Sequence, residues 1–315
     1  MRIISLIAPC YNEDSVIEQY YSRICSVADR HKEYEFEFVV VDDASVDQSL
    51  AILDRLAQND SRLKVIHLAS NVGHQTALFA GIENATGDIN VTLDIDLQDP
   101  PELLSEFLAK IDLGFDVVHA QRKSRSGESL FKLISAKLFY QVIKHTSKVK
   151  IIKDCGDFRA FTKPVRQTII RFREKHKFLR GLFVLVGFKQ TIIQYERCAR
   201  YGGETKYTLI KMTNLAVDAM LNFSQFPIRL MFIVSSLMWS LGFIYLIKAM
   251  FSRFVFGTAI EGWTSIIFFQ VLFTGVLLFF IALLGAYIGR IYEQGQSRPL
   301  YWIRYTKNID QDHDG

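Results

Sequence analysis

Short apolar runs alternate with stretches of helical spacing along the first 122 residues. The apolar runs predict buried strands at 3–9, 35–43, 63–69, 88–96 and 115–122. Apolar residues three and four positions apart predict helices between them, at 12–30, 48–57 and 75–84. This alternation predicts an α/β fold, a mostly parallel sheet with helices on both faces. In such sheets a ligand binds beyond the carboxyl ends of the strands.

Two long uncharged stretches follow near the C-terminus, at 230–247 and 263–289. A helix needs about 18 to 20 apolar residues to cross the hydrocarbon core of a bilayer, and both stretches are near or above that length. We therefore expect two transmembrane helices. A pair of buried helices in a large soluble core is the alternative, which the length of the second stretch disfavours.

Basic residues flank both apolar stretches, while the connection between them holds only Lys248 and Arg253. The flanking cations are Arg197, Arg200, Lys206, Lys211 and Arg229 before the first stretch, and Arg290, Arg298, Arg304 and Lys307 after the second. Because cytoplasmic flanks carry the excess of Lys and Arg, this pattern predicts that the large N-terminal region and both termini are cytosolic.

Composition narrows the class of protein further. The chain has 315 residues, and its 37 Lys and Arg against 33 Asp and Glu give a net charge of +4, too weak to indicate a nucleic-acid partner. A content of 50% apolar and 22% charged residues excludes disorder. The cysteines are far apart in sequence, which disfavours a zinc site and fits a reducing compartment. No GxGxxG follows the first strand, so a dinucleotide site is also disfavoured.

Carboxylates gather where two of the predicted strands end. Asp94 and Asp96 close the fourth strand and are followed by Gln98, and Asp42 and Asp43 close the second. Alternation along a strand sends Asp94 and Asp96 to the same side, where their charges repel unless a cation lies between them. Oxygen ligands of this kind suit Mg²⁺ or Mn²⁺ carrying a diphosphate. The alternative is a solvated acidic turn, since Asp and Pro are common turn residues.

These motifs together resemble a known family. The segments 9–13, 41–47, 71–73 and 94–101 resemble the ordered motifs of family-2 inverting glycosyltransferases, which have a GT-A-like fold. Three further segments, at 121–128, 154–159 and 197–207, resemble the polyprenyl-phosphate glycosyltransferases, and the two apolar stretches fit the bactoprenol branch best.

The resemblance implies a role for each matching residue. Pro9, Tyr11, Glu13, Asp42 and Asp43 are expected to bind the nucleotide. Asp96 and Gln98 are expected to hold the metal, Asp94 to contact the sugar or the ribose, and Asp157 to face the reacting carbon. Donor and acceptor phosphates are expected to meet Arg122, Arg125, Arg200 and Lys206, although Arg125 also fits a solvated side chain. We interpret His74 and His119 as structural or packing residues.

The resemblance also implies the reaction. It is the inverting, metal-dependent transfer of a hexose, glucose from UDP-glucose, to undecaprenyl phosphate. GDP-mannose or a modified pentose nucleotide is an alternative donor, and a membrane scaffold without enzyme activity is an alternative of another class. The expected location is the cell (inner) membrane, as a multi-pass protein. Gln270, with Gly275, Gly285 and Gly289, would permit association into a homo-oligomer.

The expected domains follow from these patterns. A cytosolic catalytic domain covers 1–205, a juxtamembrane amphipathic helix 206–227, two transmembrane helices 228–290 and a cytosolic tail 291–315. A second amphipathic stretch, at 130–144, has lysines around an apolar face, which fits a helix on a membrane surface or one packed on the sheet.

Overall fold

The computed structural model describes residues 1–123, 152, 155–172, 174–175, 177–196, 226–256 and 262–309. The chain divides into two compact units. The first, here called the α/β unit, holds the described residues up to 196 together with those from 298 onward. The second, the helical unit, holds 226–256 and 262–297. The C-terminal segment therefore belongs to the same unit as the N-terminal strands.

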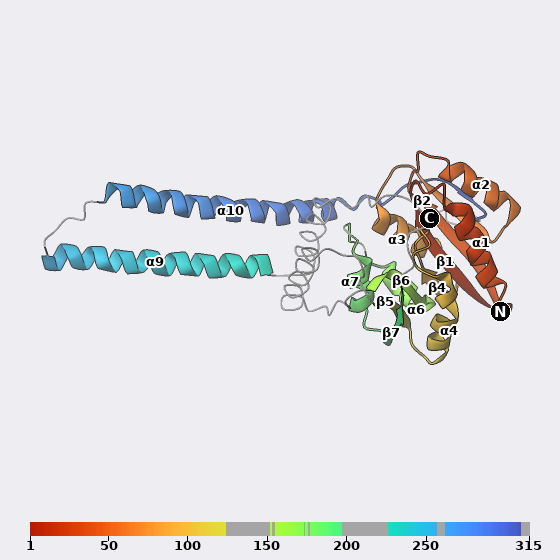
Figure 1. Cartoon of the computed structure of the whole chain (residues 1–315). Helices are drawn as coiled ribbons and strands as arrows, with labels where there is room; N and C mark the ends of the chain where they lie inside the picture. Colours follow the sequence, from red (N-terminus) through yellow and green to blue (C-terminus); the bar gives the residue numbers. More distant parts are fainter. Residues whose placement is uncertain are drawn as a thin grey trace. The chain divides into compact units, whose positions relative to one another are not determined.

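The described part of the α/β unit is built on one eight-stranded sheet with the order β7-β5-β6-β4-β1-β2-β3-β8 (Figure 1). The strands are β1 (Arg2–Cys10), β2 (Tyr34–Asp42), β3 (Leu63–Leu68), β4 (Ile89–Thr92), β5 (Val117–Arg122), β6 (Cys155–Thr162), β7 (Gln190–Tyr195) and β8 (Ile303–Lys307). The central row β4-β1-β2-β3 is parallel. Strand β6 pairs antiparallel with both β4 and β5, β7 runs parallel to β5, and β8 pairs antiparallel with β3.

Helices cover both faces of this sheet, as the alternating pattern predicts. The helices of the unit are α1 (Ile17–Ala28), α2 (Ser49–Asn59), α3 (His74–Asn84), the short 3₁₀ helix η1 (Pro101–Leu103), α4 (Leu104–Asp112), α6 (Lys163–Ile169) and α7 (Leu179–Leu185). On one face Ile4 and Leu6 of β1 pack in a core with α1, α2 and α4. On the other, Ile7 packs in a core with α3, α6 and α7. Successive β1 side chains thus enter opposite cores, which is why the strand is almost continuously apolar.

The fourth strand is shorter than the sequence predicts, and this corrects the position of the acidic motif. Strand β4 ends at Thr92, its last residue paired with β1 and with β6, so Asp94 and Asp96 lie in the turn that follows. The prediction that these two carboxylates lie within a strand is therefore wrong, although both are partly exposed while Leu93, Ile95 and Leu97 are buried. Leu97 has a left-handed backbone with φ of 60°, which an extended strand does not allow.

Three strands carry no clear signal in the hydropathy pattern. Strands β6 and β7 contain charged or polar residues such as Asp157, Arg159 and Gln194 at positions where a buried strand usually has apolar ones. Strand β8 lies within the segment predicted as a tail at 291–315. Each is a strand because the sheet offers it a partner edge, a long-range effect that periodicity does not contain.

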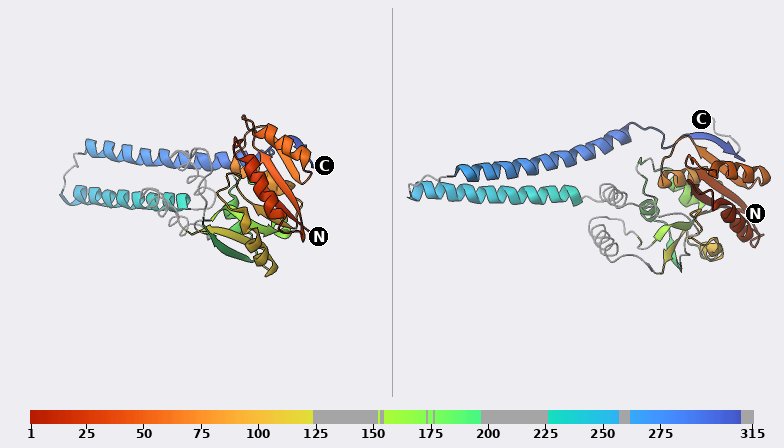
Figure 2. Two further views of the ribbon diagram at one scale, coloured as in Figure 1. Left: turned by 45° about the vertical axis from the view of Figure 1, so that its right-hand side comes forward. Right: turned by 45° about the horizontal axis from the view of Figure 1, so that its top comes forward.

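The helical unit contains two long helices, α9 (Phe226–Phe256) and α10 (Trp263–Gly295), which run side by side (Figures 1 and 2). Among the described residues one helix is long and apolar enough to cross a membrane, namely α10 over Phe269–Gly295, with a mean hydropathy of 2.5. The apolar part of α9, Leu230–Tyr245, is shorter. Two transmembrane helices therefore remain a prediction.

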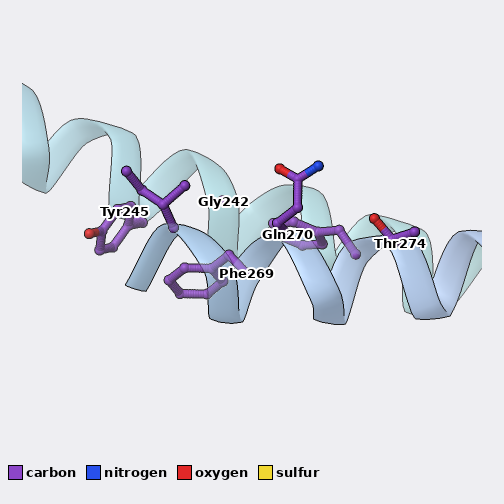
Figure 3. A pocket seen from close by; sticks show the side chains of 7 residues that line it. Gly242, Tyr245, Phe269, Gln270 and Thr274 are labelled. Atoms are coloured by element: carbon purple, nitrogen blue, oxygen red, sulfur yellow. The ribbon is translucent and has the colours of Figure 1, made fainter. Parts of the chain in front are cut away.

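A groove of about 450 Å³ lies between α9 and α10 (Figure 3). The rings of Tyr245 and Phe269 meet in it with their centroids 5.2 Å apart. Gln270 and Thr274 add polar groups to the lining, and Gly242 contributes no side chain. The described carboxylates of the α/β unit do not line this groove.

Candidate active site

The loops after three neighbouring parallel strands hold most of the described residues that were predicted to form a site. Tyr11 and Glu13 follow β1, Asp43 follows β2 and Asp94 follows β4. Because β4, β1 and β2 are adjacent and parallel, their carboxyl ends lie at one edge of the sheet. This is the edge at which open parallel sheets bind ligands.

Each of these three loops contains one residue with a left-handed backbone. The residues are Asn12 (φ 53°), Ala44 (φ 58°) and Leu97 (φ 60°). For an L-residue other than glycine this conformation costs roughly 1–2 kcal/mol. Such strain tends to concentrate at functional sites, where the surrounding structure holds it in place.

His74 links two carboxylates at this edge. It is the first residue of α3, and its Nε2 lies 3.7 Å from Oδ1 of Asp94 and 3.5 Å from Oδ2 of Asp157. Burial disfavours the imidazolium, but the hydrogen bond to Asp157 and the charges of both carboxylates outweigh it and raise the pKa of His74 to about 9. The sequence analysis interpreted His74 as a structural or packing residue, and the structure places it between two carboxylates.

Asp157, on β6, is held by two arginines. Arg180 of α7 donates from Nε to Oδ1 at 3.1 Å and from Nη2 to Oδ2 at 2.9 Å, and Arg159 Nη2 lies 3.5 Å from Oδ1. Gln75 donates to Oδ2 at 2.9 Å. Burial alone would raise the pKa of this carboxyl, but the charge of Arg180, with the hydrogen bonds from His74 and Arg180, lowers it well below its ordinary value. The cationic neighbours of Asp157 therefore favour its ionised form.

The pKa of Asp94 is shifted in the opposite direction. Burial raises its pKa to about 6, and although His74 acts against this, the nearby carboxylates of Asp99, Asp157 and Asp96 add to it. A cation beside Asp94 would remove this repulsion. Asp96 accepts from the backbone N–H of Gln98 at 3.1 Å, which closes the turn. In the part of the chain that the structure describes, no three His, Cys, Asp or Glu side chains are grouped as metal ligands.

Asp42 and Asp43 are buried and bind neighbouring loops. Asp43 accepts from the backbone N–H of Val72 at 2.7 Å and of Gly73 at 2.9 Å, and burial raises its pKa despite these bonds. Gly73 has a φ of 86°, which a side chain would disfavour, and it leads directly into His74. Asp43 thus fixes the start of α3, and with it the position of His74.

The remaining predicted residues fall into two groups. Pro9 is buried within β1, and Tyr11 is 39% exposed in the loop that follows. Arg122, at the end of β5, donates from Nε to the hydroxyl of Tyr195 at 3.3 Å, and that hydroxyl donates to Asp99 at 2.5 Å. Arg125, Arg200 and Lys206 lie outside the described residues.

Three residues of the site were not predicted as functional: His74, Gln75 and Arg180. The first two directly follow the 71–73 motif, so their place at a strand-end loop was a usable signal. Arg180 had none, because its contact with Asp157 joins residues from α7 and β6. The packing role predicted for His119 agrees with the structure, since it is buried, contacts Gln190 at 2.9 Å, and burial lowers its pKa to about 4.

Comparison with known proteins identifies the class of protein to which this α/β fold and its acidic strand-end loops belong. Residues 5–169 match the model of Glycosyl transferase family 2. The chain therefore belongs to glycosyltransferase family 2, and it is a glycosyltransferase with a GT-A-like fold.

Several relatives match nearly the whole chain. It is similar to the uncharacterized glycosyltransferase YkcC of Bacillus subtilis, with 40% identity covering 97% of this chain and 94% of the relative. It is also similar to a prophage bactoprenol glucosyl transferase homolog of Escherichia coli, with 34% identity covering 96% and 99%. A solved structure of Mycobacterium tuberculosis glucosyl-3-phosphoglycerate synthase shares 17% identity, covers 70% of this chain and 76% of its own, and has a TM-score of 0.47.

Proposed function

We propose that this glycosyltransferase transfers glucose from UDP-glucose to undecaprenyl phosphate, with inversion at the anomeric carbon and with bound Mg²⁺ or Mn²⁺. The relatives named as bactoprenol glucosyl transferases support the acceptor and the sugar, since they match this chain at 34% identity over nearly its whole length. The long apolar helix α10 supports a lipid acceptor, which stays at a bilayer.

The ion-paired state of Asp157 is the observation that carries this proposal. A carboxylate held by Arg180 and Arg159 is a weak base. A phosphate acceptor does not need a strong base, because a phosphate monoester has a second pKa near about 6 and its oxygen is already anionic at neutral pH. A sugar hydroxyl as acceptor would need one. Asp157 thus fits a phosphate nucleophile better than a hydroxyl.

In the proposed reaction one bond forms and one bond breaks. An oxygen of the acceptor phosphate forms a bond to the anomeric carbon, while the bond from that carbon to the donor diphosphate breaks and its electron pair leaves with UDP. Attack from the face opposite the diphosphate converts an α-linked donor into a β-linked lipid product. Positive charge develops on the sugar ring meanwhile, and the ionised carboxylate of Asp157 stabilises it.

The acidic turn after β4 fits a divalent ion. Asp96 and Gln98 offer hard oxygen ligands, and Asp94 lies among carboxylates whose repulsion an added cation would reduce. Mg²⁺ is commonly bound by one or two carboxylates with substrate phosphates completing the shell, so a larger cluster of protein ligands is not required. The ion would act as a Lewis acid on the departing diphosphate.

The other predicted residues complete this proposal. Pro9, Tyr11, Glu13, Asp42 and Asp43 would form and support the nucleotide pocket, and Arg122 would meet the donor phosphates. Arg200 and Lys206 would meet the acceptor phosphate. The domains would be those predicted from the sequence, except that the residues from 298 onward belong to the α/β unit. The protein would lie in the cell membrane with the catalytic unit and both termini cytosolic.

The test is transfer by the purified full-length protein in lipid nanodiscs that contain undecaprenyl phosphate. UDP-glucose should give a lipid-linked product, whose β configuration NMR would establish, and excess chelator should stop the reaction. A product from GDP-mannose or a pentose nucleotide alone would replace the donor assignment, and full activity in chelator would refute the metal.

Asp96→Ala should lower kcat by about 100-fold or more, because loss of a Lewis acid removes several kcal/mol of transition-state stabilisation. Asp112→Ala is the matched control, since this aspartate forms an exposed pair with Arg2 at 2.8 Å away from the strand-end loops. The control should keep wild-type activity. Equal activity of the two variants would contradict the metal role of Asp96.

A further inference from the structure

The C-terminal strand, β8, is the outermost strand on one side of the sheet and lies next to β3. Strand β8 pairs antiparallel with β3, with Tyr305 directly opposite His67 and a register shift after His67. The two rings lie with their centroids 4.3 Å apart. Residues directly opposite in an antiparallel pair have their side chains on the same face, so this ring contact is a property of the register.

Four side chains from four elements form a continuous network behind the nucleotide loops. Tyr305 of β8 donates from its hydroxyl to Oδ2 of Asp54, on α2, at 2.9 Å. Oδ1 of Asp54 lies 3.1 Å from Nε2 of His67, and Nδ1 of His67 lies 3.3 Å from Oδ2 of Asp42. His67 and Asp42 are fully buried. Both ring nitrogens of His67 thus face a carboxylate oxygen, which fixes the ring in one orientation.

Asp42 connects this network to two loops. Its carboxylate accepts from the backbone N–H of Ser45, at 3.3 and 3.4 Å to the two oxygens. The hydroxyl of Ser45 accepts from the backbone N–H of Asn12 at 3.0 Å, and the Asn12 side chain accepts from the N–H of Val46 at 2.9 Å. Asp42 therefore sets the spacing between the loop after β2 and the loop after β1, which carries Tyr11 and Glu13.

We propose that Tyr305, Asp54 and His67 are positioning residues for the donor nucleotide, acting through Asp42 and the two loops that it joins. The inference rests on the proposed function, in which those loops bind the nucleotide. According to this inference, the segment that follows the long helices supports the donor site without contacting the donor.

Tyr305→Phe tests this with little structural change, because it removes one oxygen and keeps the ring on His67. The matched control is Tyr301→Phe, another tyrosine of the C-terminal segment, whose hydroxyl donates to Glu83 at 2.6 Å and accepts from Asn84 at 3.2 Å. Both variants are compared as full-length protein in nanodiscs. The measurements are UDP affinity by calorimetry, KM and kcat for the donor, and the melting temperature.

Tyr305→Phe should weaken UDP binding and raise the donor KM about threefold to tenfold, the size expected for the loss of one ordinary hydrogen bond, with kcat within twofold of wild type. Tyr301→Phe should leave UDP affinity and the donor KM unchanged, although its melting temperature should fall about as much as that of Tyr305→Phe. Asp54→Asn should act in the same direction as Tyr305→Phe.

Two results would overturn the inference. Equal UDP affinity and KM in the two tyrosine variants, when wild type binds UDP, would remove the positioning role and leave the proposed function intact. Wild-type protein that binds none of UDP, GDP and CDP would remove the proposed function, and this inference with it.

Discussion

The two carboxyl groups that face His74, those of Asp94 and Asp157, have pKa values shifted in opposite directions. Asp157 has two arginine partners and a pKa well below its ordinary value, whereas burial and neighbouring carboxylates raise the pKa of Asp94 to about 6. The strand-end loops thus hold one carboxylate that stays ionised, Asp157, and one, Asp94, whose ionised form needs a nearby cation. This separation of roles suits the proposed function, in which the site binds a dianionic diphosphate next to a developing positive charge.

His74→Gln should lower the melting temperature most at low pH. Because the folded-state pKa of His74 is raised from 6.5 to about 9, its stabilising effect is fully present below about pH 6.5 and is lost as pH rises through about 9. Melting curves from pH 6 to 10 check this. His119→Gln is the control, since burial keeps that histidine neutral over the range and its effect should not change with pH between 7 and 10. A His74→Gln difference that stays constant to pH 10 would contradict the charged state.

Sequence reasoning at the residue scale found the acids and missed their partners. Asp94, Asp96 and Asp157 lie in local motifs, so their neighbours in sequence identify them. Arg180 contacts Asp157 only because α7 and β6 pack together, a tertiary effect with no local pattern. The same holds for His67 and Tyr305, which are joined by strand pairing.

At the scale of elements, the strand-end loops are strained and the strands are not. Asn12, Ala44 and Leu97 have left-handed backbones in three successive loops along the sheet edge. Each loop is held by hydrogen bonds to side chains, such as that from the backbone N–H of Val46 to Oδ1 of Asn12. Strain of this kind tends to concentrate at functional sites, where surrounding contacts hold the backbone in place.

Ala44→Gly should stabilise the α/β unit by about 0.5–1 kcal/mol, since relief of a left-handed alanine exceeds the entropy cost of glycine. The same substitution at Ala51, exposed in α2, should instead destabilise by about 1 kcal/mol, because that residue is helical. Denaturant titration of both full-length variants gives the two free energies of unfolding. Destabilisation of similar size in both would show that Ala44 is not strained.

Elements were predictable where the pattern is local. Strands β1, β2 and β3 and helices α1, α2 and α3 lie within a few residues of their predicted bounds, because each has a continuous apolar side facing a core. The end of β4 was missed, since residues 93–97 remain apolar at alternate positions while the chain has already turned. Strand β8 was missed because only the edge of β3 makes it a strand.

At the scale of the whole molecule, the topology can be tested on intact cells. A cysteine at Thr258, in the connection between α9 and α10, should react with a membrane-impermeant maleimide from outside, because the cation flanks predict cytosolic termini. Lys32→Cys, on the exposed surface of the α/β unit, should react only after lysis. Both are made in a chain lacking its native cysteines. Labelling at Thr258 only after lysis would refute the two-span topology.

The pairing of β8 with β3 also constrains the order in which the protein can fold. Tyr305 and Asp54 are 251 residues apart, and the chain between them contains both long helices. The outer edge of β3 therefore has unpaired backbone groups until ribosomes have made nearly the whole protein, and an open edge invites pairing with other chains. The last strand can reach this edge only after α9 and α10 have been synthesised. A chain truncated within the helices would thus keep an aggregation-prone edge on β3.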